Sequence, residues 1–448
     1  MNLEFFKKRR FRVILSILIA AAALFVMTGQ LRRISFYKEK VLTVGVFSDS
    51  YWGVQSGYAN KIIDDAILAF EKEHPDVKVK YESGIMKDDY SEWLSERMMK
   101  DSAPDVFFIL GGDFNTFARI GALKNLGELI SKDQAFDQNA FYKSAYAYGQ
   151  YGGRQYALPF ECAPNMMFVN KTILDRENIE LPAKDWTWDD FYEICRKVTK
   201  DKDGTGVINQ FGTVNYTWVD AFDANGVVLF DEKGNGCDFT VPEVGDAITF
   251  MEKLESLGSG DALSEKDFAK GNVAFQPMLF SEYRAYKSRE LSIKKYSGFE
   301  WDCLTMPSGP NGDNNSRLDI LSIAMSENTA QEAMAWEFMK LLTMDPVIQS
   351  EIFDYSAGIS VLPQVTQTED SLSRITRNTG EAFNLDILES AMEKSVIQPR
   401  FRGYENAKEE IGLAVRSILE SRSNIRMEQI IWNRTINNYL KSLQINEY

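Results

Sequence analysis

Acidic, amide and aromatic side chains stand close together at several points of this sequence. In the stretch ECAPN, Glu161 is the first residue and Asn165 the last, and Tyr51 and Trp52 follow the apolar run VLTVGVF. Aromatic rings offer flat apolar faces, while carboxylates and amides hydrogen-bond to hydroxyl groups. These residue types suit the binding of a solute that carries many hydroxyl groups.

Residues for nucleophilic catalysis are scarce. The only histidine, His74, directly precedes Pro75 at an expected helix end, and the chain has no G-x-S-x-G elbow. Neither a Walker A loop nor a dinucleotide fingerprint is present. We therefore expect no enzyme and no catalytic residue. A glycosidase needs only two carboxylates, so a carbohydrate-active enzyme stays as an alternative.

The four cysteines, Cys162, Cys195, Cys237 and Cys303, form no C-x-x-C pair. With a single histidine in the chain, we expect no metal site and no cofactor. The acidic run DKDGTG (201–206) lacks the spacing of a calcium loop and is predicted to be a surface turn. Export would permit disulfides in any of three full pairings, but we expect buried free thiols.

Charge is unevenly distributed along the 448 residues. Residues 1–40 hold nine Lys/Arg and two Asp/Glu, a net +7, so with a total of -15 the remainder carries -22. An acidic body argues against nucleic acid as a partner, because the phosphate backbone needs a basic surface. The composition is that of a globular protein, and the length favours two or three domains.

The N-terminus joins a basic flank (1–12) to an apolar segment (13–29). As a helix, residues 11–29 would span about 28 Å, close to the thickness of the hydrocarbon core. The basic flank would stay in the cytoplasm by the positive-inside rule, which places the body at the extracytoplasmic face of the membrane. No plain A-x-A site follows Ala23, so we expect an uncleaved anchor, with a cleaved signal peptide as the alternative.

Strand and helix patterns alternate beyond this segment. VLTVGVF and VKVKYE read as strands on either side of a helix over 62–74, and DVFFIL is a nearly continuous apolar strand after a helix over 88–100. This order predicts an α/β fold with largely parallel sheets and loops gathered at one edge.

The segment YGGRQYALPFECAPNMMFVNK (151–171) is the centre of the predicted organisation. Two apolar runs flank ECAPN, and Pro159 and Pro164 cannot donate to a strand ladder. We therefore predict two short strands with a bend, crossing from one lobe to another. The alternative is a buried strand pair with a kink at the surface.

The order of several motifs resembles extracellular solute-binding proteins of family 1, the maltose-binding-protein-like receptors of ABC importers. The resemblance rests on YALP with FVNK in the central segment, on APDVFFILGGDFNTFARIGALKNL (103–126), on GNVAFQPMLF (271–280) and on the strand and long helix after Arg317. It covers residues 41–365. The cysteine that usually follows the apolar run in such receptors is absent here.

The resemblance implies a two-lobed, type II periplasmic-binding-protein-like fold, in which each lobe is a mainly parallel sheet flanked by helices. We expect an N-lobe at 41–160 and 308–358, a C-lobe at 161–303 and 365–448, and hinge crossings near 161–166, 303–307 and 358–364.

The resemblance also implies a monomeric receptor that captures a carbohydrate, an oligosaccharide, in an interlobe cleft by hinge closure and delivers it to an ABC permease. The alternative is a membrane-anchored sensing subunit that signals to a sensor kinase, for which the missing lipidation cysteine argues.

We place the ligand-binding side chains at strand ends that would face this cleft. For each of them the alternative is a packing aromatic or a solvated polar group. The candidates are Tyr51, Trp52, Asp113, Glu161, Asn165, Trp218, Tyr283, Asp319 and Tyr355.

Overall fold

The computed structural model describes residues 40–53, 60–231, 233–258, 263–287, 298–376 and 383–445. The expected membrane segment (13–29) and its basic flank (1–12) lie outside these residues. Within the ranges just given, no helix is both long enough and apolar enough to cross a bilayer.

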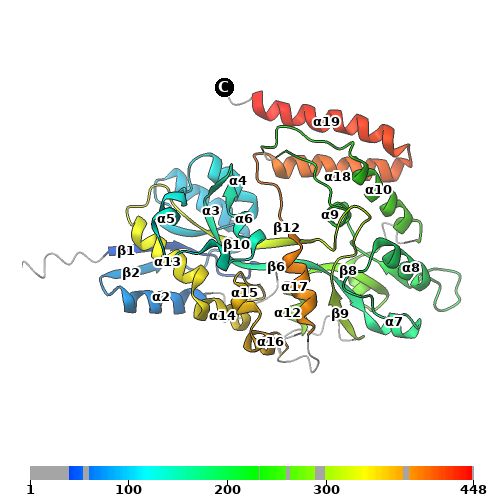
Figure 1. Ribbon diagram of the computed structural model, residues 1–448, viewed down its shortest axis with the longest axis horizontal. Helices are drawn as coiled ribbons and strands as arrows, with labels where there is room; N and C mark the ends of the chain where they lie inside the picture. Colours follow the sequence, from blue (N-terminus) through cyan, green and yellow to red (C-terminus); the bar gives the residue numbers. More distant parts are fainter. Residues whose placement is uncertain are drawn as a thin grey trace, which may run out of the picture.

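One mixed sheet of ten strands runs through the whole molecule (Figure 1). Its main path is β2-β1-β3-β10-β6-β8-β7, with β9 and β11 paired to β6 and β12 paired to β10. The outer strands of each half run parallel: β1 with β2 and β3, and β7 with β8. The strands are β1 (Lys40–Gly45), β2 (Val77–Tyr81), β3 (Val106–Ile109), β6 (Ala157–Asn170), β7 (Phe211–Thr213), β8 (Val273–Leu279), β9 (Trp301–Leu304), β10 (Ser316–Met325), β11 (Ile359–Ser360) and β12 (Ser395–Val396), and a separate hairpin pairs β4 (Gln150–Tyr151) with β5 (Arg154–Gln155).

Helices cover the sheet in both halves, so the α/β fold class is confirmed (Figure 1). Around β1 to β3 lie α2 (Lys61–Glu73), α3 (Lys87–Met99), α4 (Gly111–Arg119), α5 (Gly127–Lys132), η1 (Gln138–Ala140), α6 (Lys143–Tyr148), α13 (Glu332–Met344) and α14 (Pro346–Tyr355). Around β7 and β8 lie α7 (Lys171–Arg176), α8 (Trp188–Val198), α9 (Trp218–Ala224), α10 (Pro242–Glu255), α11 (Glu265–Ala269), α18 (Tyr404–Ser421) and α19 (Ile425–Ile445). The remaining helices are α12 (Phe280–Lys287), α15 (Pro363–Thr366), α16 (Glu369–Thr376) and α17 (Leu385–Glu393).

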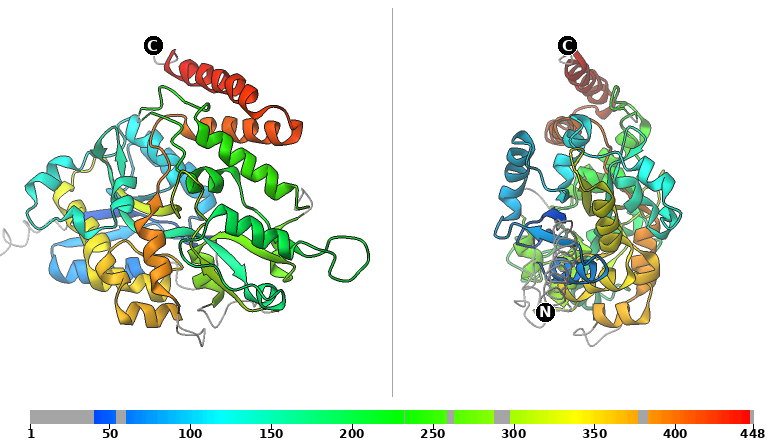
Figure 2. Two further views of the ribbon diagram at one scale, coloured as in Figure 1. Left: turned by 45° about the vertical axis from the view of Figure 1, so that its right-hand side comes forward. Right: turned by 90° about the vertical axis from the view of Figure 1, so that its left-hand side faces the viewer.

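The molecule has two large hydrophobic cores, the first of which extends from β1–β3 to β8, β9 and α12. The first includes Val106 and Phe107 of β3 with Phe338 of α13, and the second includes Phe275 of β8 with Ile411 of α18. Helices α10, α18 and α19 are stacked outward from the second core (Figure 2). Burial of apolar side chains at about 25 cal/mol per Å² therefore stabilises both halves, and the first core also packs them together.

Strand β6 is one continuous strand of 14 residues, all of them buried, so the prediction of two short strands with a bend is wrong. Its prolines lie where the ladder is irregular. Ser322 of β10 is opposite Pro159 but Leu321 is opposite Glu161, so a β-bulge lies beside Pro159. Proline is tolerated at a bulge because a regular ladder hydrogen bond is not required there.

The second proline lies where β6 changes its partner. Pro164 is the last residue paired to β10, and pairing with β8 begins at Asn165. The bulged residue, Phe160, is also satisfied, since its carbonyl accepts a hydrogen bond from Nε2 of Gln349 at 3.0 Å. The strand therefore continues through both prolines and links the two halves.

Two candidate residues that we placed at strand ends, Asp113 and Tyr283, lie on helices in the structure. Gly111, Gly112 and Asp113 form the first turn of α4 instead of a loop after β3. Likewise α12 begins at Phe280, directly after β8, so Tyr283 lies on a helix and not on a loop. Only Leu110 separates β3 from α4, and no residue separates β8 from α12.

Candidate functional site

The linking strands β6 and β10 carry polar side chains on one shared face. Ala163 lies opposite Asp319, and Glu161 lies opposite Leu321. Alternate residues of a strand point to the same side, so these pairs and their neighbours form one surface. We call this surface the crossing face: Glu161, Ala163 and Asn165 on β6, and Arg317, Asp319 and Leu321 on β10.

Glu161 is a buried carboxylate at one end of the crossing face. Only 4% of the residue is exposed, and Oγ of Ser356 donates to its Oε2 at 2.5 Å. Beside it lies a cavity of about 50 Å³, which Tyr51, Asn60 and Tyr355 also line. The cavity would hold a few water molecules, and water or ligand hydroxyl groups there would have polar partners.

Trp52 covers the middle of the crossing face. It packs against Ala163 together with Ala285 of α12 and Ala357, and its Nε1 has no hydrogen-bond partner among the described residues. A Cβ atom at Gly358 would lie 2.7 Å from this Nε1 and 2.5 Å from Oε2 of Glu161. A glycine is therefore needed at position 358 for both side chains to occupy these positions.

Tyr51 holds the first loop against the crossing face. Its hydroxyl donates to the carbonyl of Ile320 at 3.2 Å, and Nζ of Lys87 lies 5.3 Å from the centre of its ring. Burial, and then the nearby Tyr148 and Asp319, raise the pKa of Tyr51 well above its usual value. The ring is thus a fixed, neutral wall beside Asp319.

Asn165 connects the crossing face to α9. Its Nδ2 donates to Oδ1 of Asp220 at 2.8 Å. The other oxygen of Asp220 accepts from the backbone and hydroxyl of Thr217, at 2.8 and 2.7 Å, as part of the capping box of α9. One carboxylate therefore caps the helix and fixes the amide of the crossing face.

Several charged groups meet near Asp319. Nε of Arg317 lies 3.9 Å from Oδ1 of Asp319, whose side chain is 38% exposed. Burial raises the pKa of Asp319, while Arg317 and Lys408 oppose the rise. Burial also raises the pKa of Asp223 to about 7, with Arg317 again acting in the opposite direction. Carboxylates and cations held together in this way can accept from and donate to hydroxyl groups.

Arg400, on the connection between β12 and α18, lies between aromatic rings. Its Cζ is 3.4 Å from the ring centre of Tyr148 and 5.0 Å from that of Phe114. Nη1 donates to the carbonyl of Gly111 at 3.4 Å, while Nε and Nη2 are buried without a partner among the described residues. Two donors of a buried guanidinium therefore remain available, and such groups are costly to leave unpaired.

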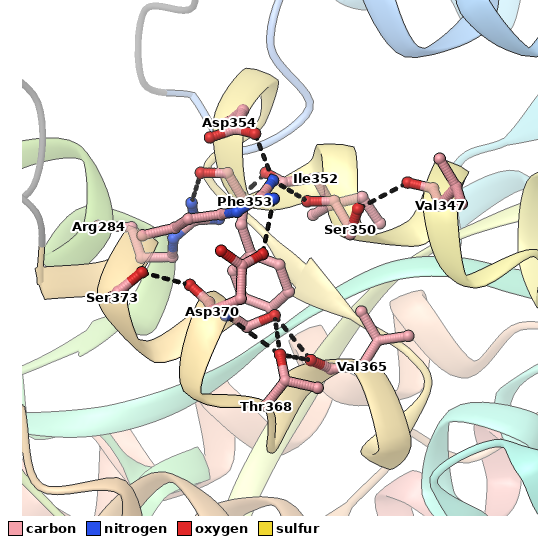
Figure 3. Close-up of polar contacts among 12 residues, drawn as sticks. Arg284, Val347, Ser350, Ile352, Phe353, Asp354, Val365, Thr368, Asp370 and Ser373 are labelled. Atoms are coloured by element: carbon pink, nitrogen blue, oxygen red, sulfur yellow. Dashed lines mark hydrogen bonds and ion pairs between the residues drawn. The ribbon is translucent and has the colours of Figure 1, made fainter.

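Two arginines hold the end of α14, and Figure 3 labels one of them, Arg284, beside Ile352 and Phe353. Arg284 of α12 donates to the carbonyls of Ile352 (3.3 Å), Phe353 (2.6 Å) and Gly358, and Arg374 of α16 pairs with Asp370 and Asp354. Cations stabilise a helix C-terminus because its last carbonyls are unpaired. Since α14 leads into Ser356 and Gly358, these contacts position the residues that meet Glu161.

Six of the nine candidate residues lie together. Glu161, Asn165 and Asp319 belong to the crossing face, and Tyr51, Trp52 and Tyr355 surround it.

The other three lie elsewhere. Asp113 accepts from Oγ of Ser91 at 2.5 Å, and Trp218 faces α18. Tyr283 is 2% exposed and is stacked on Phe280 with ring centres 5.2 Å apart, inside the first core.

Sequence reasoning missed the charged partners Arg317, Asp223, Arg400 and Lys408. Arg317 had a usable signal, because it lies two residues before Asp319 on the same strand and so shares its face. The others are on segments far apart in the sequence and meet only in the folded chain.

All four cysteines are buried and free, as expected. The DKDGTG run is a turn in which Oδ1 of Asp201 accepts from the backbone of Gly204 at 2.8 Å and Oδ2 from that of Gly206 at 2.6 Å. Its carboxylate is therefore already occupied. Among the residues that the structure describes, no group of three or more potential ligands could hold a metal ion.

Residues 52–347 match the model of the bacterial extracellular solute-binding protein family. The chain belongs to this family. Its fold is accordingly the two-lobed fold of periplasmic binding proteins, and the family consists of solute-binding proteins rather than enzymes.

Individual relatives are distant. An uncharacterized lipoprotein of Streptomyces antibioticus is 25% identical over 288 residues, 59% of each chain. The arabinooligosaccharide-binding protein of Halalkalibacterium halodurans is 23% identical over 185 residues, 39% of this chain and 40% of the relative. The chain thus spans less than two thirds of the length of the curated relatives it matches.

Among solved structures, the cyclic α-maltosyl-1,6-maltose binding protein from Arthrobacter globiformis superposes with a TM-score of 0.74 at 17% identity. The match covers 90% of this chain and 99% of that one. The similarity shows that the two chains share a fold.

Proposed function

We propose that the protein is an extracytoplasmic receptor that captures an oligosaccharide at the crossing face and delivers it to an ABC importer permease. The observation that supports this proposal is the arrangement of side chains at the crossing face. It combines fixed aromatic rings with a buried carboxylate at Glu161 and a partly exposed carboxylate and guanidinium at Asp319 and Arg317. Solute-binding relatives named for arabinooligosaccharide and for a maltosyl-maltose ring support the choice of ligand class.

The proposed ligand contacts follow from this geometry. Rings would stack on the apolar faces of sugar units, carboxylates would accept from hydroxyl groups, and Arg317 and Arg400 would donate to ring and hydroxyl oxygens. The proposed set is Tyr51, Trp52, Glu161, Asn165, Asp223, Arg317, Asp319, Tyr355 and Arg400.

Capture would involve movement of the two lobes about the crossings. The proposed N-lobe is 41–160 with 308–358, the C-lobe is 161–303 with 365–448, and the hinges are near 161–166, 303–307 and 358–364. The cavity beside Glu161 is too small for a sugar unit, which favours a wider form that admits the ligand. Contacts to both lobes would then stabilise a closed form.

We further propose that the protein is a monomer held at the outer face of the membrane by residues 13–29, uncleaved. The family supports a permease partner and an extracytoplasmic location, and the basic flank and apolar segment of the sequence support the anchor. Beyond the missing lipidation cysteine, no observation favours a sensor kinase as the partner.

Thermal unfolding of the full-length chain tests the proposal, in a detergent whose head group is not a sugar. A ligand that binds only the folded state raises the melting temperature. We expect a rise with maltooligosaccharides or arabinooligosaccharides, its loss in Asp319→Asn and its retention in Asp185→Asn, an exposed carboxylate elsewhere. No rise with either series, or an equal rise in Asp319→Asn, would contradict the proposal.

A further inference from the structure

A groove runs along α18 outside the crossing face. Trp218, at the start of α9, lines two hollows of about 580 and 530 Å³, and Gly412 and Arg416 of α18 line both as well. The second hollow also includes Lys408. Figure 1 shows α9 directly beside α18. The two hollows therefore form one continuous surface around Trp218, which we call the α18 groove.

Three residues of the α18 groove form a straight row. Lys408, Gly412 and Arg416 are spaced by four, so they lie on one face of α18 at steps of about 6 Å. A Cβ atom at Gly412 would be 3.2 Å from Nε1 of Trp218. The glycine thus lets the indole lie close to the helix, between the two cations.

Both cations of the row are free to bind. Within the described part of the chain, neither Lys408 nor Arg416 forms a hydrogen bond or an ion pair through its side chain, although acidic residues such as Glu405, Glu409 and Glu420 lie near them. A flat indole between two unpaired donors resembles the chemistry of the crossing face, where rings and charged groups also alternate.

The row lies near the crossing face because α9, which begins with Trp218, is joined to that face by the hydrogen bond from Asn165 to Asp220. The charge of Lys408 also lowers the pKa values of Asp319 and Asp223, which burial raises. Asp319 is on β10 and Asp223 is on α9, the helix that begins with Trp218. A ligand that reaches Lys408 from the crossing face would therefore meet Trp218 next.

We propose that the α18 groove binds the outer units of an oligosaccharide whose first units lie at the crossing face. This inference rests on the proposed function and adds to it a ligand longer than the crossing face alone can hold. Trp218 would stack on one unit, and Lys408 and Arg416 would donate to hydroxyl oxygens on either side of it.

Calorimetric titration of the full-length protein tests this with two ladders, maltooligosaccharides and arabinooligosaccharides, each from disaccharide to heptasaccharide. Affinity of the wild-type protein should rise with chain length beyond the trisaccharide. Trp218→Ala and Arg416→Ala should each lower affinity for the heptasaccharide about 5- to 20-fold, corresponding to about 1–2 kcal/mol. Affinity for the disaccharide should stay unchanged.

Arg434→Ala is the matched control, because Arg434 is an exposed arginine on α19 outside both hollows. Arg416 is exposed, so its variant should keep the wild-type melting temperature even if Trp218→Ala does not. Equal losses of affinity for short and long oligosaccharides, or no loss of affinity for the long ones, would overturn the inference. Neither result would contradict binding at the crossing face. If neither ladder binds the wild-type protein, the proposed function fails and this inference fails with it.

Discussion

Asn165 and Asp220 form a hydrogen bond of 2.8 Å between Nδ2 and Oδ1 that joins strand β6 to helix α9. Both residues are buried, with 6% and 5% exposure. The same carboxylate completes the capping box of α9, which begins with Trp218. The orientation of the crossing face and of the α18 groove therefore depends on one carboxylate.

Replacing this carboxylate separates its two roles. Asp190 has the same capping-box geometry on α8, with Thr187 in place of Thr217, but its bonds are exposed and it has no partner on β6. Asp190→Ala should lose about 1 kcal/mol of unfolding free energy, the value of a cap. Asp220→Ala should lose about 3 kcal/mol, because a buried amide is also left unpaired. Urea unfolding measures both, and equal losses would show that the bond to Asn165 contributes nothing.

Gly358→Ala should disturb the crossing face by steric contact. The added methyl group would lie 2.5 Å from Oε2 of Glu161 and 2.7 Å from Nε1 of Trp52. We expect a loss of about 1–3 kcal/mol in stability and at least a roughly tenfold loss of oligosaccharide affinity. Gly112→Ala is the control, since a Cβ atom there meets nothing within 4 Å. Unchanged affinity in Gly358→Ala would exclude Glu161 and Trp52 from the site.

Stability should depend on the protonation of Asp223. Its pKa is about 7 in the folded chain, above the value near 3.9 of an unfolded aspartate. The folded state therefore binds more protons between about pH 4 and 7, so this group makes stability fall as pH rises through that window.

Asp223→Asn removes that dependence. The variant should match the wild type near pH 4 and exceed it by at least about 1 kcal/mol at pH 8.5, since one pKa unit corresponds to about 1.4 kcal/mol. Glu351 also has a pKa of about 7. Its contribution cancels when the unfolding free energies of the two proteins are subtracted. Urea unfolding across this pH range measures the effect, and a constant difference would contradict it.

The buried thiols give a prediction about labelling by thiol reagents. All four cysteines are free and buried, and burial raises the pKa of Cys162 and Cys195 well above the usual value. A thiol reagent should label none of them in the native protein and all four after unfolding, since the thiolate is the reactive form. A reductant should not change the melting temperature. A lowered melting temperature in reductant would indicate a disulfide.

Sequence reasoning recovered the fold because its signals are local. Helical patterns predicted α2 and α3, and the order of strands and helices, with the family motifs, predicted the α/β fold. It failed at β6, where two prolines read as a break. The bulge beside Pro159 and the exchange of partner strands at Pro164 depend on β10 and β8, which are more than a hundred residues away.

The candidate residues that lie together were predicted from local signals as well. Glu161, Asn165 and Asp319 lie together because they are on strands that cross the molecule, and their ligand-binding role stays a prediction. Tyr283 had the same sequence signature as a ligand aromatic, but Phe280 and other rings enclose it. Arg400 gave no signal, because only folding brings it between Phe114 and Tyr148.

Small-angle X-ray scattering of the full-length protein, with and without a saturating oligosaccharide, tests most directly whether the two lobes close on a ligand. Detergent matched to the solvent in scattering density would leave the protein signal alone. The account predicts a smaller radius of gyration in the complex, and no change for Asp319→Asn at the same ligand concentration. An oligosaccharide that binds the wild-type protein by calorimetry and leaves its radius of gyration unchanged would contradict capture by closure.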